Sequence, residues 1–365
     1  MRFEIRPRAK LRPAQDLGLT LLAVVVSFLG GGVVMYFAGL SPTAAFYAIF
    51  HGAFFGGAYA LSDTTVKAIP LILCGLGCAL AFRAGMWNVG AEGQLLLGAW
   101  AATGVASFWL PADLPAAIHL ALMMLAGCLA GAAWGAVPGW LKARFGVSEI
   151  LSSLMLVYVA VQWNTYWIYS PWSDRGFQLT PLFPESAWLP RLSDYAGRFP
   201  SLAGLTVHAG LPIALAGAAI LAVLMLYTRW GVTWRAMGDN PRAAAAAGMR
   251  VKDHMVLAML LSGAAAGLAG AVEVAGVVHR LQERFSPGFG FTAITVAWLA
   301  RLNPWATIFV AFIFGGILVG GKEVGSQGIS SLLQGALLLS VIIFEWFRTH
   351  EINIKRRPDQ EDERP

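Results

Sequence analysis

Apolar stretches long enough to span a lipid bilayer recur along the whole chain, separated by short polar segments. A spanning helix needs about 20 mainly apolar residues. By that measure about ten spans are predicted, at residues 17–40, 66–83, 87–110, 115–141, 147–169, 210–229, 254–278, 289–302, 304–321 and 328–347. The pattern therefore predicts an all-α, polytopic membrane protein.

Two parts of this pattern leave alternatives open. Arg301, Asn303 and Pro304 interrupt the apolar stretch between the eighth and ninth spans. They mark either a tight turn or a kink in one long helix, and a kink would reduce the count to nine. Residues 44–60 are apolar but short and rich in Gly and aromatics, so an interfacial or re-entrant helix is expected there instead of a span.

The basic residues predict the orientation in the membrane. If the N-terminus is cytoplasmic, most Lys and Arg residues fall inside, and the outer side receives only Lys67, Arg175, Arg191, Arg198, Arg280, Arg284 and Lys322. This bias is the one that the positive-inside rule expects. We therefore expect a basic cytoplasmic tail (1–16), a transmembrane domain (17–348) with an outer loop (170–209) and a cytoplasmic loop (230–253), and a cytoplasmic C-terminal tail (349–365).

Composition supports the membrane assignment and excludes some functions. The chain is 57% hydrophobic and only 13% charged, against roughly 25% charged in soluble proteins. Its net charge of +6 follows from the loops and does not imply nucleic-acid binding. Cys74, Cys78 and Cys128 lie inside apolar runs, so they are expected to be buried and reduced, with no metal site. No GxxxxGK[ST] motif is present, so energy from ATP would have to come from a partner.

Three polar side chains stand out inside the third apolar stretch. The segment MWNVGAEGQLLLG, residues 86–98, carries Asn88, Glu92 and Gln94. An ionised carboxylate at the bilayer centre costs roughly 2.5–3.5 kcal/mol, so such groups face the interior of a helix bundle. They either join helices through buried hydrogen bonds or contact a solute. Glu273, in the seventh span, is a further candidate for lining a cavity, paired with an Arg.

Aromatic residues gather near the outer end of the fifth span. They fit an aromatic belt at the membrane interface. Alternatively, some of them, with Trp87 or Phe82, stack on a nucleobase. The residues concerned are Trp163, Tyr166, Trp167 and Tyr169.

The cytoplasmic loop has an unusual composition for a connector. In the segment GDNPRAAAAAG, residues 238–248, Asn240 is placed to cap a helix, with Pro241 at its first position and Gly248 at its end. A short helix over residues 242–247 with basic flanks is suited to docking a soluble partner. The alternative is an ordinary positive-inside loop that happens to be helical.

Together, WNVGAEGQLLLGA at 87–99, GVTWRAMGDNPRAAAAAGM at 231–249 and SGAAAGLAGAVE at 262–273 resemble the permeases of ABC importers for nucleosides and simple sugars. The resemblance covers roughly residues 60–345. It implies a bacterial-type inner-membrane permease with a coupling helix in the 230–253 loop, an ATPase partner, a second permease chain and an external substrate-binding protein. It implies no covalent chemistry and no cofactor.

The resemblance also suggests roles for individual residues. Those implied for the solute path are Trp87, Asn88, Glu92, Gln94 and Glu273. Those implied for coupling to the ATPase are Arg235, Gly238, Asn240, Arg242, Ala243, Ala244 and Gly248. Nucleosides are the expected solute, and sugars, riboflavin-like compounds and branched-chain amino acids are alternatives.

Two other classes of protein are disfavoured. An ion-coupled transporter is disfavoured because no inverted repeat of broken, charged helices is evident. An intramembrane enzyme is disfavoured because no HExxH motif is present.

Overall fold

The computed structural model describes residues 2–7, 13–37, 39–111, 114–323, 328, 332–333, 335–337, 339–340, 343–344 and 350–355. The chain divides into two compact units. One contains Met1–Ala44 and Gly328–Pro365, and the other contains Ala45–Gln327.

The first unit contains helix α1 (Pro13–Phe37) and a two-stranded sheet. Strand β1 (Arg2–Pro7) pairs antiparallel with strand β2 (His350–Lys355), in a register that runs from Arg2 opposite Lys355 to Pro7 opposite His350. The sequence analysis did not predict this sheet, because both strands lie in the polar tails outside the apolar stretches. The predicted span 17–40 falls on α1, whereas much of 328–347 lies outside the described residues.

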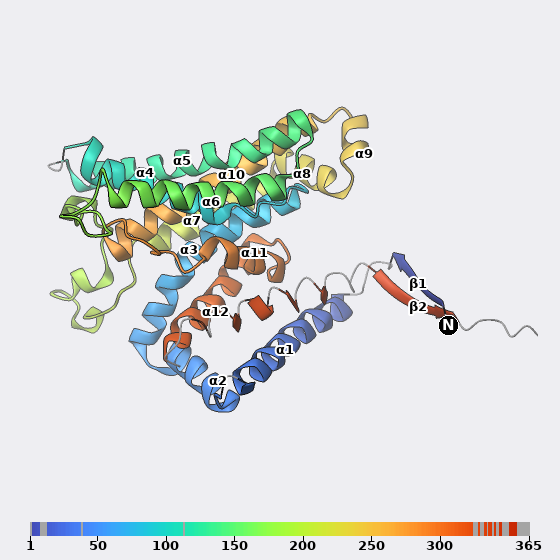
Figure 1. Cartoon of the computed structure of the whole chain (residues 1–365), viewed down its shortest axis with the longest axis horizontal. Coiled ribbons are helices and arrows are strands. Elements are labelled where there is room, and N and C mark those ends of the chain that lie inside the picture. The colour runs from blue at the N-terminus through green and yellow to red at the C-terminus, as the bar shows by residue number, and fades with distance from the viewer. Residues whose placement is uncertain are drawn as a thin grey trace, which may run out of the picture. The chain divides into compact units, whose positions relative to one another are not determined.

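The second unit is helical, and its elements follow the predicted spans closely (Figure 1). In chain order they are α2 (Pro42–Phe50), which begins at the boundary of the units, η1 (His51–Phe55), α3 (Ala58–Arg83), α4 (Ala91–Gly104), η2 (Val105–Trp109), α5 (Ala116–Phe145), α6 (Glu149–Tyr169), η3 (Glu185–Ala187), η4 (Leu192–Tyr195), η5 (Pro200–Leu202), α7 (Gly210–Tyr227), α8 (Arg229–Asp239), α9 (Pro241–Ala246), α10 (Val251–Glu273), η6 (Val274–Val278), α11 (Phe289–Leu299) and α12 (Pro304–Glu323).

Five of the described helices are long and apolar enough to cross a membrane: Ala58–Arg83, Ala116–Phe145, Gly210–Tyr227, Val251–Val278 and Pro304–Lys322. The structure thus confirms a helical protein with several candidate spans, and ten crossings stay a prediction. Between α11 and α12 the chain makes a tight turn, because Arg301 and Leu302 have positive φ and the Asn303 side chain accepts hydrogen bonds from the first backbone N–H groups of α12. The alternative of one kinked helix is therefore wrong.

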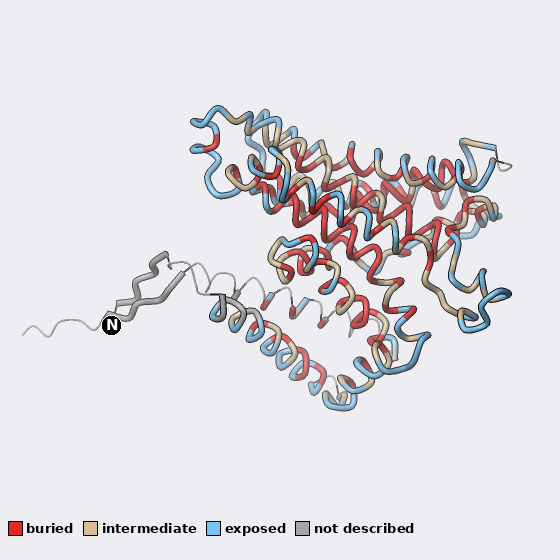
Figure 2. Tube along the Cα trace, turned by 180° about the vertical axis from the view of Figure 1, so that it is seen from behind, coloured by how far each residue is buried: buried red, intermediate tan, exposed pale blue. Residues whose placement is uncertain are grey.

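Glycines let three helices of the second unit pack closely (Figure 1). A Cβ added at Gly267 of α10 would lie 2.8 Å from the Cα of Gly131 in α5, and one added at Gly127 would lie 2.6 Å from the Cβ of Ala271. A Cβ added at Gly98 of α4 would overlap the backbone of Gly267. Small residues allow this approach where no hydrophobic effect drives helices together. Buried positions accordingly follow the inner faces of these helices in Figure 2.

Candidate functional site

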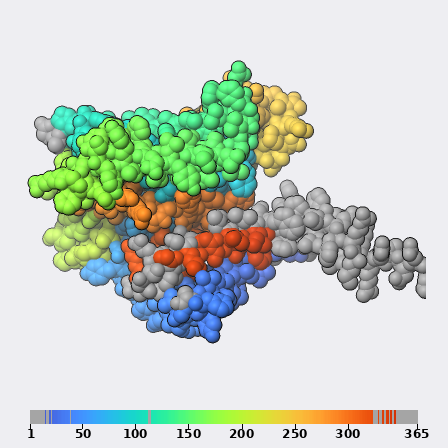
Figure 3. All heavy atoms as spheres, viewed as in Figure 1, coloured from blue at the N-terminus to red at the C-terminus, as the bar shows by residue number. Residues whose placement is uncertain are grey.

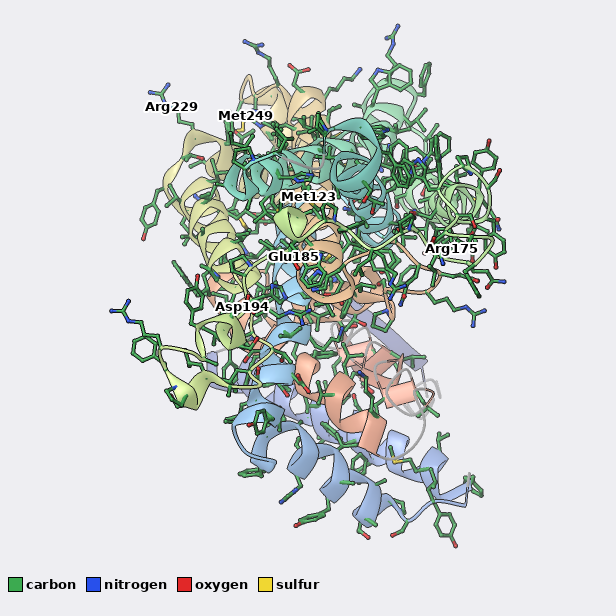
Figure 4. All side chains as sticks on the ribbon, turned by 90° about the vertical axis from the view of Figure 1, so that its left-hand side faces the viewer. Met123, Arg175, Glu185, Asp194, Arg229 and Met249 are labelled. Carbon is green, nitrogen blue, oxygen red and sulfur yellow. The ribbon has the colours of Figure 1, made fainter. Side chains whose placement is uncertain are left out.

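Helix ends that were expected on the cytoplasmic side meet at one end of the second unit. A cavity of about 350 Å³ there is lined by Arg83 at the end of α3, Met225 near the end of α7, Arg235 of α8 and Arg301 of the turn before α12. The α8–α9 segment lies at this end, where α9 projects beyond the other helices of the second unit in Figure 3. The outer loop, residues 170–209, lies at the opposite end and carries the labelled Arg175, Glu185 and Asp194 in Figure 4.

Asn88 and Gln94 form a buried amide pair. Asn88 Nδ2 donates to Gln94 Oε1 at 2.8 Å, and Gln94 Nε2 donates to Asn88 Oδ1 at 3.0 Å. Asn88 Nδ2 also donates to Ser262 Oγ of α10 at 2.8 Å, and Asn88 Oδ1 accepts from the backbone N–H of Gly90. An Asn amide has two donors and two acceptor positions, so all four are used within the protein. The pair joins the start of α4 to α10.

Glu92 connects the beginnings of two helices that are far apart in sequence. Its Oε2 accepts a hydrogen bond of 2.6 Å from the backbone N–H of Gly290, in the first turn of α11. The hydroxyl of Ser286 also hydrogen-bonds this carboxyl and accepts from the N–H groups of Gly288 and Phe289. A carboxylate at a helix N-terminus satisfies free N–H groups and is favoured by the helix dipole.

Glu273 is buried in an ion pair with Lys67. Lys67 Nζ of α3 lies 2.9 Å from Glu273 Oε1 at the end of α10, and the two side chains are 19% and 1% exposed. The expectation of an Arg partner is therefore wrong. The signal for Lys67 was present in the sequence, because it is a lone basic residue just inside an apolar stretch, but the charge count placed it with the outer residues.

Trp87 belongs to an aromatic stack with Phe82 of α3 and Trp298 of α11. Its ring centroid lies 5.4 Å from those of both Phe82 and Trp298, and the Phe82 and Trp298 rings are 5.6 Å apart. Trp87 remains 43% exposed. The residues predicted for the solute path thus make four separate sets of contacts: Trp87 with its stack, Asn88 with Gln94, Glu92 with α11, and Glu273 with Lys67.

An arginine that the sequence analysis did not single out helps to hold the 170–209 loop to η6. Arg191 donates to the backbone carbonyls of Gly276 and Val277, and its Nη2 lies 2.7 Å from His279 Nε2. The His279 ring stacks on Trp188, with centroids 4.1 Å apart. These contacts span more than 80 residues of sequence, so no local pattern could have indicated them.

Helix α9 forms much as the loop sequence predicts, whereas α8 was not predicted. Asn240 Oδ1 accepts from the N–H groups of Arg242 and Ala243, Pro241 opens α9, and Gly248 has a φ of +82° just after it. Ala244 is buried, and the rest of α9 is exposed. A cavity of about 590 Å³ lies between α9, the end of α5 and the start of α10.

Two of the residues implied for coupling also make contacts inside the chain. Arg235 Nη1 donates to the carbonyl of Met225 at 2.6 Å, which ties α8 to the end of α7. Gly238 packs on the backbone of Arg83, where an added Cβ would overlap the carbonyl oxygen. These two contacts join α8 to the end of α7 and to the end of α3.

Comparison with known proteins identifies the family. A family model described as the permease component of branched-chain amino acid transport systems matches residues 60–342. The chain belongs to this family of ABC transporter permeases. Members of the family work with an ATPase subunit and a substrate-binding protein, and they are membrane transport subunits without catalytic activity of their own.

Several characterised permeases are similar over nearly their whole length. The permease is 36% identical to a glucose ABC transporter permease of Haloferax volcanii, over 96% of this chain and 94% of that protein. It is 33% identical to the guanosine ABC transporter permease NupP of Bacillus subtilis, over 89% and 91%. Identity to the nucleoside permease NupB of Lactococcus lactis is 30%, over 89% of each chain. No solved structure matches the permease.

The buried amide pair of the permease gives a first prediction. We expect Asn88→Leu to lower the free energy of unfolding by about 3 kcal/mol, since it leaves the Gln94 amide and the Ser262 hydroxyl unpaired at roughly 1–3 kcal/mol each. Asn164→Leu is the matched control, because Asn164 is also buried but its Oδ1 has no partner. The midpoint of thermal unfolding in detergent measures both, and equal losses would contradict a special role for the pair.

Two buried histidines at the end of the second unit opposite α9 predict a pH dependence. Burial, followed by the charge of Arg191, lowers the pKa of both His208 and His279 from 6.5 to about 4. Because the unfolded histidines protonate first, stability falls as the pH drops from about 6.5 to 4, by at most about 3 kcal/mol per residue. The thermal unfolding midpoint should decrease as the pH is lowered across this range. In the His279→Gln variant the midpoint should decrease less steeply with pH. An unchanged slope in the variant would contradict this origin.

Proposed function

We propose that this permease is one of two different permease subunits of an ATP-driven importer for nucleosides, located in the cytoplasmic membrane. The nucleoside assignment is carried by the similarity to NupP and NupB over about nine tenths of the chain. Solute arrives from an external binding protein, and a separate ATPase hydrolyses ATP. Glucose is the second candidate solute, favoured by the 36% identity to the Haloferax volcanii permease.

Pairing with a second permease is supported by the relatives themselves. The chain is also 26% identical to the guanosine permease NupQ of Bacillus subtilis and 24% identical to the nucleoside permease NupC of Lactococcus lactis. Each of these bacteria therefore has two different nucleoside permeases that resemble this chain, and we infer that this permease has a corresponding partner.

In this proposal α9 is the coupling helix. It is a short, capped knob with basic flanks, and the adjacent cavity of about 590 Å³ is lined by Arg242, Arg250 and Lys252. A rigid, positively charged surface of this kind suits a partner with acidic side chains. Closure of the ATPases on ATP would push α9, and α8 would carry the motion to α3 and α7 through Gly238 and Arg235. Ala243 and Gly248 allow close seating because they have little or no side chain, whereas Ala244 is buried and packs α9 against its own chain instead of the ATPase.

The proposed topology has ten spans with both termini in the cytoplasm. It is supported by the basic side chains gathered at the α9 end of the second unit. These include Arg83, Lys142, Arg235, Arg242, Arg250, Lys252 and Arg301.

We assign different roles to the polar residues within the membrane region. Asn88, Gln94 and Glu92 fix the ends of α4 and α11, since their hydrogen bonds are made to the protein itself. Glu273 is assigned to the solute path because one of its carboxylate oxygens is buried without a partner. Trp87, which is partly exposed, is assigned to the wall of the path near its cytoplasmic end.

Two experiments test the proposal in sequence. Affinity purification of the tagged permease from its native membrane should recover a P-loop ATPase and a second permease. The complex, reconstituted in vesicles with its binding protein, should then take up radiolabelled guanosine only when ATP is supplied. Competition by unlabelled nucleosides but not by glucose would support the nucleoside assignment, and the reverse would establish glucose. A homo-oligomer without an ATPase in crosslinked preparations would overturn the importer proposal.

A further inference from the structure

Three elements of the second unit meet around the ion pair of Lys67 and Glu273, and a fourth approaches it. Lys67 Nζ donates to Glu273 Oε1 at the end of α10 and lies 5.4 Å above the ring of Phe289, the first residue of α11. The ring of His208, two residues before the start of α7, packs against Gly276, which follows Glu273 by three residues. Lys67 is partly exposed, whereas residues 68–82 of the same helix are buried without interruption. Between Lys67 and Arg83 at the far end of α3, the helix is therefore enclosed in the packed core.

This cluster contains an open acceptor and an open donor. Glu273 Oε2 and His208 Nε2 are both buried and have no hydrogen-bond partner. Glu273 is 1% exposed and His208 is 3% exposed. The Gly210 N–H donates to His208 Nδ1 at 3.1 Å, so in the neutral ring the proton is on Nε2. Burial lowers the pKa of His208 to about 4, which keeps the ring neutral at pH 7.

Unpaired buried groups are costly, at roughly 1–3 kcal/mol each, and native proteins have few of them. Two such groups beside one ion pair point to a ligand that completes the hydrogen bonds. The pair is neutral as a whole, so it would not favour a charged solute. A hydroxyl can donate to Glu273 Oε2 and accept from Lys67 or His208 at the same time. Two adjacent hydroxyls would use the donors and the open acceptor together.

We propose that Lys67, Glu273 and His208 bind the adjacent hydroxyls of a sugar ring as it passes through the permease. The inference rests on the proposed function and deepens it. Nucleosides and glucose share such a ring, so this site recognises the part common to both candidate solutes. The site does not contact the base of a nucleoside, so the binding protein would discriminate among nucleosides with different bases.

The test compares maximal uptake rates, because the binding protein controls capture at low concentration. In vesicles containing the complete complex, inosine and 2′,3′-dideoxyinosine are supplied at concentrations that saturate the binding protein. We expect wild-type permease to move inosine about tenfold faster, the effect of losing one hydrogen bond to a charged group. Lys67→Met and Glu273→Gln should bring the ratio of the two rates close to one. If glucose is the solute, 2-deoxyglucose and 3-deoxyglucose replace the dideoxynucleoside.

Controls separate this role from a structural one. Glu283→Gln removes an exposed carboxylate in the segment between η6 and α11, which accepts a hydrogen bond from the Tyr169 hydroxyl. This variant should leave the ratio of the inosine and dideoxyinosine uptake rates unchanged. ATPase activity stimulated by the binding protein verifies assembly of each variant. A double variant, Lys67→Met with Glu273→Met, replaces single variants that fail to assemble, because it leaves no lone buried charge.

The outcomes distinguish the two levels of the proposal. Equal maximal rates for inosine and its dideoxy analogue in the wild type, or an unchanged ratio in assembled variants, would overturn the sugar-ring site alone. Uptake of neither nucleosides nor glucose by an active wild-type complex would overturn the proposed function and the site with it.

Discussion

Replacing Gly248 with tryptophan is expected to abolish ATP-driven uptake while the permease still inserts and folds. Gly248 ends the α9 region with a φ of +82°, and no atom lies within 4 Å of an added Cβ, so the indole would project from the proposed docking surface. Obstructing a central interface position costs ~2 kcal/mol or more. Uptake in reconstituted vesicles should therefore fall by about thirtyfold or more, and co-purification of the ATPase should weaken with it.

Gly146→Trp is the matched control for this variant. Gly146 also has a positive φ, +70°, open space around an added Cβ and a place in a short loop, between α5 and α6. It should retain uptake. Gly248→Ala separates backbone strain from bulk, since a left-handed conformation costs a non-glycine residue only about 1–2 kcal/mol, and it should keep most of the activity. Full uptake by Gly248→Trp would remove α9 from the coupling mechanism.

Gly267→Leu is expected to produce the largest loss of stability. The added Cβ would lie 2.8 Å from Gly131 Cα and would overlap the carbonyl oxygen of Gly127, so α5 and α10 would have to separate. Overpacking a well-packed core costs typically 1–3 kcal/mol. The atoms that the new side chain would meet are backbone atoms of α5, which cannot move aside as a flexible side chain can. We expect a loss of about 3 kcal/mol or more, seen as a lower yield of monodisperse permease and a lower unfolding midpoint in detergent.

Gly30→Leu provides the comparison. Gly30 is also inside a helix, α1, but nothing lies within 4 Å of an added Cβ. Replacing a mid-helix glycine in open space is expected to be neutral or to stabilise by about 0.5–1 kcal/mol. If Gly30→Leu and Gly267→Leu lower the midpoint equally, the close approach of α5 and α10 is not what the second substitution disrupts.

Local patterns in the sequence were sufficient to predict the helices and α9. Apolar stretches of suitable length mark each described helix of the membrane region, and Asn240, Pro241 and Gly248 indicate the start and end of α9 because capping depends only on neighbouring residues. The polar side chains of Asn88 and Gln94 were recognisable as internal because hydrocarbon tolerates such groups only with a partner.

The partners themselves were not predictable, because they come from distant parts of the chain. Glu92 binds Gly290, which is 198 positions away, and Lys67 binds Glu273, 206 positions away. An apolar pattern reports which residues are buried but not which helices are neighbours. For the same reason the Trp87 stack with Trp298 and the Arg191 contacts with η6 were found only in the structure, as was helix α8.

The small sheet of the first unit limits how the chain can be threaded through a bilayer. Because β1 and β2 are hydrogen-bonded partners, we expect residues 2–7 and 350–355 to lie on the same face of the membrane. Every crossing between them must then be matched by a return, so the number of crossings is even. Ten satisfies this parity and nine does not. A reporter that is active on only one side, fused in turn to each terminus, should therefore give the same signal at both.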